Sequence, residues 1–116
     1  MDSPSKVTLD YLKSKGITNI YKTNMPDLDV CTCLYDSGGY PNDGNVGKPT
    51  IMVRHRNTDY ETGYSLMQSI KNYLDNVATG SNIFSYQIVG DINYLGKDEV
   101  GRYDYTLNFI AYKDGI

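Results

Sequence analysis

Nucleophilic catalysis is the first chemistry to consider, because the chain has one histidine, His55, and two cysteines, Cys31 and Cys33. A histidine on one strand can activate a thiol on a neighbouring strand. His55, however, lies between two arginines in a segment typical of a strand, far in sequence from either cysteine. We interpret His55 as a structural or interfacial residue. The cysteines are two residues apart, so we expect them to pack on one strand face as free thiols rather than as a disulfide.

Metal and cofactor sites are the second possibility, and the candidate motifs are incomplete. Gly47-Lys48 lacks the earlier glycine and the following hydroxyl residue of a phosphate-binding loop. Asp91 and Asn93 lack the closing glutamate of a calcium loop. Two thiols alone cannot complete a zinc site. We therefore predict no catalytic residue, no bound metal and no cofactor, and expect that the protein is not an enzyme.

Charged side chains offer a different chemistry, which is recognition between subunits. Arg54 and Arg56 share one strand face, and their guanidinium forks suit carboxylates. Asp98 and Glu99 lie in a turn beside Arg102, where water should prevent large pKa shifts. Either these charges are simply solvated, or the carboxylates of one chain pair with the arginines of the next. All five are candidate interface residues.

The first element that must position these residues is an N-terminal helix. Ser3 suits the N-cap, Pro4 suits the first helical position, and Lys15-Gly16 suits the end. Ser3 can accept a hydrogen bond from an unpaired backbone N–H, and glycine tolerates the left-handed conformation that follows a helix. The sequence therefore predicts a helix over residues 4–15.

A second helix has the clearer pattern. Thr58 and Glu61 form a capping box, and Thr79-Gly80 suits the end. Apolar residues at three-and-four spacing predict one buried stripe along it. The stripe consists of Gly63, Leu66, Met67, Ile70, Tyr73, Leu74 and Val77.

Alternating side chains predict strands over residues 17–23, 29–35, 49–57, 83–89, 91–95 and 102–113. In the third strand, Ile51, Val53 and His55 should share one face, opposite Met52, Arg54 and Arg56. In the last strand, Tyr103, Tyr105, Leu107, Phe109 and Ala111 should line the covered face, opposite Arg102, Asp104, Thr106 and Asn108.

The least regular segment is 36–48, which is rich in glycine, asparagine and aspartate. Thirteen residues without an evident element in a small domain indicate function or disorder. We expect a mobile arm that becomes ordered against a partner, with Tyr40 and Asp43 as candidate contact residues.

Grouped strands and two helices predict one α+β domain over residues 1–116, with a mainly antiparallel sheet and both helices on one face. Net charge is −3, and no basic patch is evident for binding nucleic acid. Twelve of the 14 aromatic residues are tyrosines, which are common at protein interfaces. We see no apolar run that spans a bilayer and no signal peptide, so we expect a cytoplasmic protein that does not associate with membranes.

Residues 94–109, which include Asp98-Glu99-Val100-Gly101-Arg102, resemble the closing hairpin of a tailed-phage family of minor capsid proteins grouped with tail terminators. Three upstream segments resemble the same family in the same order. They are Met25-Pro26-Asp27, Gly38-Gly39-Tyr40-Pro41 and residues 49–56.

The resemblance implies a structural virion protein of a long non-contractile tail. Such terminators form a six-membered ring that caps the head-proximal end of the tail tube, stops tube growth and docks the head connector. The resemblance implies that the partners of this chain are copies of itself, the tail tube protein and the head connector. Assembly would take place in the host cytoplasm, and DNA would pass through the ring without specific binding. The alternatives are another connector, a tube-like component, or a small ligand-binding module that uses segment 36–48 as a lid.

Overall fold

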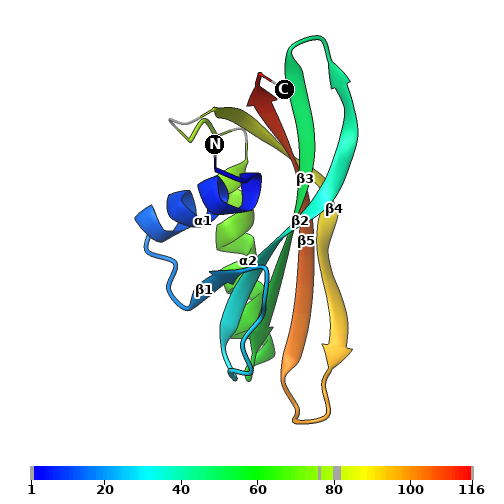
Figure 1. Ribbon diagram of the computed structural model, residues 1–116. Helices are drawn as coiled ribbons and strands as arrows, with labels where there is room; N and C mark the ends of the chain where they lie inside the picture. Colours follow the sequence, from blue (N-terminus) through cyan, green and yellow to red (C-terminus); the bar gives the residue numbers. More distant parts are fainter. Residues whose placement is uncertain (1, 76, 80–81, 116) are drawn as a thin grey trace.

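A five-stranded sheet organises the chain in the computed structural model, which describes residues 2–75, 77–79 and 82–115 (Figure 1). Along the chain the elements are α1 (Pro4–Ser14), β1 (Ile20–Lys22), β2 (Cys31–Asp43), β3 (Val46–Asn57), α2 (Tyr60–Leu74), β4 (Ile83–Lys97) and β5 (Tyr103–Asp114). The strand order is β1-β2-β3-β5-β4. β1 runs parallel to β2, and the other three pairings are antiparallel. The sheet is therefore mainly antiparallel, as the sequence predicted, and the parallel β1–β2 pairing makes it mixed.

Both helices lie on the same side of the sheet in Figure 1, and we call this side the helix face. Leu12 of α1 and Met67 of α2 join one buried cluster with Val53 of β3 and Phe109 of β5. The predicted alternation is confirmed on this face, because Ile51, Val53 and His55 are fully buried. One core therefore serves the whole chain, as in a single α+β domain.

The start of each helix depends on a side-chain cap. Ser3 Oγ accepts a hydrogen bond from the Lys6 N–H, as predicted for α1. In α2 the cap is Asp59, whose Oδ2 accepts the Thr62 N–H at 2.9 Å. The prediction that Thr58 caps α2 was therefore wrong by one residue.

The end of α2 also differs from the prediction. The helix stops at Leu74, with Asp75 as its C-cap, whereas the sequence pattern extended it to 79–80. Thr79 lies outside the helix, and Gly80 lies outside the described residues. The buried stripe itself is confirmed at Gly63, Met67 and Ile70, as well as at Leu74.

The segment predicted to be irregular, 36–48, is instead the extended end of a β-hairpin. Asp43 pairs with Val46, and Gly44 and Asn45 form a two-residue turn with Gly44 at φ 60°. Register shifts between Asp36 and Gly39 and between Tyr40 and Asp43 interrupt the ladder. We call residues 36–48 the arm. It projects from the body at the end opposite the β4–β5 turn (Figure 1).

The second face of the sheet, which we call the outer face, carries Arg54 and Arg56 of β3 opposite Thr106 and Asp104 of β5. Figure 1 shows no helix over this face. Asp104 and Thr106 are nevertheless buried, at 7% and 8% exposure. The structure therefore places a buried carboxylate beside two arginines. Within the described ranges, neither helix has the length and apolarity that crossing a bilayer needs.

Candidate subunit interface and its charge cluster

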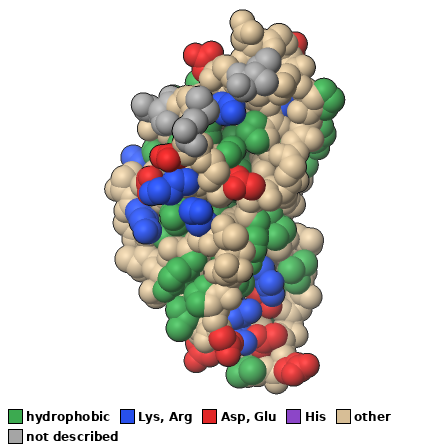
Figure 2. Space-filling model, viewed as in Figure 1, with side chains coloured by type: hydrophobic (Ala, Val, Ile, Leu, Met, Phe, Trp, Pro, Cys, Tyr) green, Lys and Arg blue, Asp and Glu red, His purple; other side chains and the backbone are tan. Residues whose placement is uncertain are grey.

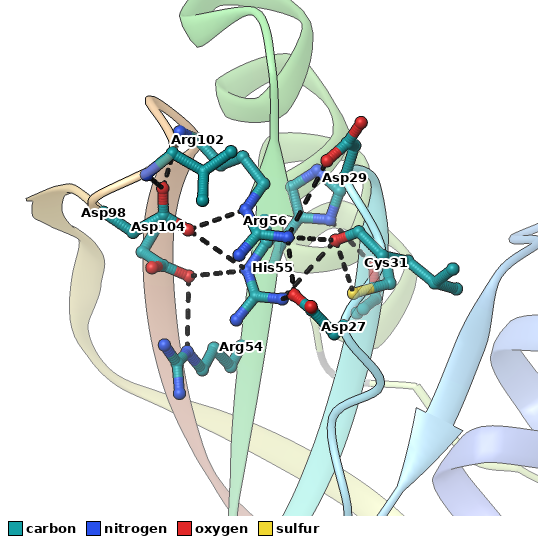
Figure 3. Close-up of polar contacts among 12 residues, drawn as sticks. Asp27, Asp29, Cys31, Arg54, His55, Arg56, Asp98, Arg102 and Asp104 are labelled. Atoms are coloured by element: carbon teal, nitrogen blue, oxygen red, sulfur yellow. Dashed lines mark hydrogen bonds and ion pairs between the residues drawn. The ribbon is translucent and has the colours of Figure 1, made fainter.

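Three arginines of the outer face converge with aspartates in what we call the arginine cluster (Figure 3). It comprises Arg54, Arg56, Arg102, Asp27, Asp29, Asp98 and Asp104. These residues come from β3, β5, the β4–β5 turn and the connection between β1 and β2. The candidates Arg54, Arg56, Asp98 and Arg102 are thus brought together within one chain.

Asp104 is the carboxylate that joins the two β3 arginines. Arg54 Nε donates to Asp104 Oδ1 at 3.3 Å, and this bond raises the pKa of Arg54. Arg56 Nε lies 3.9 Å from the same oxygen and 3.9 Å from Asp98 Oδ2. Arg56 Nε is buried without a hydrogen bond from the described residues, so its charge is balanced through space by these two carboxylates.

Arg102 holds the β4–β5 turn together with the β1–β2 connection. Its Nε donates to Asp98 Oδ2 at 2.7 Å, and its Nη1 donates to Asp27 Oδ1 at 2.9 Å. Arg56 Nη1 adds a bond to the Pro26 carbonyl at 3.2 Å. Two arginines therefore fix residues 26–28 against the sheet.

Asp98 is not the freely solvated carboxylate that the sequence predicted. The Arg102 backbone N–H donates to its Oδ1 at 2.9 Å, and the Val100 N–H donates to the same atom at 3.0 Å. The backbone bond from Arg102 is the largest cause that lowers the pKa of Asp98, to about 2. The expectation of no large pKa shift in this turn was therefore wrong for Asp98.

The remaining candidates lie apart from the cluster. Glu99 is exposed at the tip of the β4–β5 turn. Tyr40 and Asp43 are exposed on the arm, where Lys48 Nζ lies 3.8 Å from Asp43 Oδ2. Asp27, Asp29 and Asp104 were not predicted to be site residues from the sequence. Only the strand register, with Asp104 opposite Arg56, would have indicated one of them.

His55 and the cysteines lie on opposite faces of the sheet and form no nucleophilic pair. His55 Nδ1 contacts Thr32 Oγ1 at 2.9 Å, and Asn57 Nδ2 donates to His55 Nε2 at 3.2 Å. Cys31 and Cys33 are buried free thiols on the outer face. On the neighbouring strand β3 their register partners are Arg56 and Arg54, respectively. Burial raises the pKa of both thiols, which disfavours the thiolate.

Asp104 gives the first prediction, which concerns stability. Asp104→Asn removes the charge beside both β3 arginines and is expected to lower the free energy of unfolding by about 1–2 kcal/mol, a value reduced because Arg54 is 34% exposed. Asp91→Asn is the matched control. Asp91 pairs with Lys71 at 2.9 Å but is 66% exposed, so water screens the pair and its loss should be clearly smaller than that of Asp104→Asn. Urea unfolding measures both values, and equal losses would contradict the role of Asp104.

Comparison with known proteins gives the identity of the fold. A family model described as bacteriophage tail terminator protein matches residues 11–114. A search of curated proteins finds no match. Among solved structures, the chain is similar to one from "Virion of native gene transfer agent (GTA) particle", with a TM-score of 0.73 at 9% identity, covering 97% of this chain and 96% of that chain. At this identity the structural likeness supports the fold alone.

The family match begins within α1 and ends at the last residue of β5. It therefore includes the arm, the arginine cluster and the β4–β5 turn. The resemblance found in the sequence is confirmed by this match. The chain belongs to the bacteriophage tail terminator protein family.

Proposed function

We propose that this structural virion protein forms a closed ring, with six copies, at the head-proximal end of a phage tail. There it stops the addition of tail tube subunits and presents a surface to the head–tail connector. The observation that carries the proposal is the tail terminator family match over residues 11–114. The protein acts by assembly, without catalysis.

The arrangement of the sheet is compatible with a head-to-tail contact between copies. One edge of the sheet is the short strand β1, beside α1, and the other edge is the long strand β4. Exposed Phe84, Val89 and Leu95 lie on β4. Because the two edges differ, contact between them is heterologous, and a heterologous contact whose rotation closes produces a ring.

The arm is the element that we assign to the tail tube. Tyr40 is 51% exposed and Asp43 is exposed, so both can reach a partner. Weak contacts from one arm become strong when every subunit of a ring makes them at once. The arm residues pair with one another as a hairpin, which suits a projecting contact better than a lid over a ligand.

The charge of the chain is compatible with DNA passage. A lumen that duplex DNA must traverse should not hold phosphates tightly, and the chain has a net charge of −3. The assembled protein would then lie in the virion, after assembly in the host cytoplasm.

Electron microscopy and tube-growth measurements test this function. At high protein concentration, or on preformed tail tubes of the same phage, we expect closed rings by negative-stain imaging and a six-subunit mass by native mass spectrometry. Tubes that carry the ring should stop lengthening when free tube subunits are added. Continued elongation at the rate of uncapped tubes would contradict the terminator role, and open tubes built from this chain would indicate a tube-like protein instead.

A further inference from the structure

The arginine cluster leaves few charges available for contacts between subunits. Arg54, Arg56 and Arg102 already face carboxylates of their own chain, and Asp98 accepts bonds from the turn that contains it. Glu99, in contrast, is exposed and belongs to none of the ion pairs found among the described residues. Its neighbour Val100 is 72% exposed, the largest value among the exposed large hydrophobic residues of the described chain.

The β4–β5 turn holds these two side chains in a defined place. We call residues 98–102 the knob. Asp98 N donates to the Arg102 carbonyl at 2.9 Å, and Gly101 N donates to the Asp98 carbonyl at 3.1 Å. Gly101 has φ 94°, a conformation that glycine adopts without strain. A turn fixed in this way loses little conformational entropy when it binds.

A hollow of about 410 Å³ lies at the other edge of the sheet, between the end of α1 and β1. It is lined by Lys13, Ile17, Thr18, Asn19, Ile20 and Tyr21. Of these residues Ile17 and Ile20 are buried, while Tyr21 is 37% exposed. The hollow therefore combines apolar side chains with one basic side chain, Lys13.

The lysines around this hollow are available for pairing. Lys13 lines the hollow and is exposed, and no carboxylate of the described chain lies within ion-pair distance of it. Lys15 and Lys22 are also exposed and close by in sequence, and Lys15 Nζ lies 5.5 Å from the centre of the Tyr11 ring. Figure 2 shows basic side chains gathered over α1 and acidic side chains gathered at the end of the molecule that carries the knob. Surfaces of opposite charge favour head-to-tail association of identical chains.

We propose that the knob of one copy inserts into the α1–β1 hollow of the next copy. Val100 packs against Ile17 and Tyr21, and Glu99 pairs with Lys13. This inference rests on the proposed ring and assigns one of its contacts. Because knob and hollow lie at different edges of the sheet, the contact is heterologous, and each subunit uses both surfaces.

A charge swap tests the contact. Glu99→Lys and Lys13→Glu each place like charges together, so each should raise the protein concentration for half-maximal ring assembly by about tenfold. The double variant K13E/E99K restores opposite charges and should return that concentration to within about threefold of the wild type. Native mass spectrometry and ring counts on tail tubes measure assembly. Glu99 and Lys13 are exposed, so circular dichroism should show folded single and double variants.

Two controls separate this contact from a general effect of surface charge and from a contact at a different hollow. Asp114→Lys changes an exposed carboxylate at the opposite end of β5 and should leave assembly unchanged. Lys113 lines a different hollow, at the base of the arm, so Lys113→Glu tests the main competitor. Rescue of E99K by K113E rather than by K13E would overturn the proposal.

The inference and the proposed function fail in different ways. If both single charge variants assemble into rings as readily as the wild type, the knob contact is overturned and the proposed ring stands. A wild-type chain that forms no ring in solution or on tail tubes would overturn both.

Discussion

Between pH 7.5 and pH 5, the wild-type protein is expected to lose about 2 kcal/mol of its free energy of unfolding through His55, rising to about 3 kcal/mol at pH 4. His55 is fully buried. Burial lowers its pKa to about 4, from about 6.5 in the unfolded chain.

The hydrogen bonds of His55 explain why the neutral ring is preferred. Asn57 Oδ1 accepts the Asp59 N–H, so the amide of Asn57 donates to His55 Nε2. Nδ1–H is then free to donate to Thr32 Oγ1. A proton on Nε2 would face the Asn57 N–H group and remove that bond, which adds to the cost of burying a charge.

The direction of the pH effect follows from proton binding. Between pH 6.5 and pH 4 the unfolded chain binds a proton on His55 while the folded chain does not, so stability falls as pH falls. His55 is the only histidine in the chain. Lowered carboxylate pKa values, such as that of Asp98, act below about pH 4, so the window above it reports His55.

Urea unfolding at several pH values measures this effect. In His55→Gln the difference between pH 7.5 and pH 5 should nearly vanish, whatever the absolute stability of the variant. If that variant does not fold, nuclear magnetic resonance of the His55 imidazole in the wild-type protein should show no titration between pH 5.5 and pH 8. A His55 that titrates near pH 6.5 would contradict the buried neutral ring.

Gly63→Ala is expected to lower the free energy of unfolding by about 2–3 kcal/mol. A Cβ at this position would lie 2.6 Å from Tyr105 Cε2 and 3.0 Å from Asn57 Cβ. Tyr105 is fully buried, and its hydroxyl donates to the Tyr60 carbonyl at 2.6 Å. The ring also packs between Tyr60 and Tyr94, so it has little room to move.

The sign of this effect separates packing from helix propensity. Glycine in a helix interior normally costs about 0.5–1 kcal/mol relative to alanine, so propensity alone predicts stabilisation. Ser65→Ala, on the exposed side of α2, is the matched control and should change stability by less than about 0.5 kcal/mol. Chemical denaturation measures the free energy of unfolding of both variants, and the dependence of that free energy on denaturant concentration should be the same as in the wild type. If Gly63→Ala is more stable than the wild type, the Tyr105 ring can move aside for the added methyl group and the packing argument is wrong.

The helices and the faces of the strands could largely be predicted from the sequence, because they depend on local repeats. Three-and-four spacing placed Met67 and Ile70 on the buried side of α2, and alternation placed Val53 and His55 on the buried face of β3. Boundaries were less accurate. Thr58 and Asp59 are both good caps, and in the structure the cap is Asp59.

The arm shows where local composition misleads. Glycine, asparagine and aspartate are typical of loops, so 36–48 was predicted to be irregular. In the structure these residues pair across a hairpin, with Gly38 at φ 89° next to a register shift and Gly44 in the turn. The glycines permit the interruptions of a β-ladder, and composition alone does not distinguish that use from a loop.

The sequence by itself determined the two helices, the buried stripe of α2, the alternation of the long strands and the tail terminator family. Only the tertiary structure decided which charges meet. Arg56 faces Asp104 because β3 and β5 pair in one register, and Arg102 reaches Asp27 because the β1–β2 connection folds beside the β4–β5 turn. Helical and strand periodicity are properties of neighbouring residues, whereas these pairings join segments far apart in the chain, which only the packed sheet brings into contact.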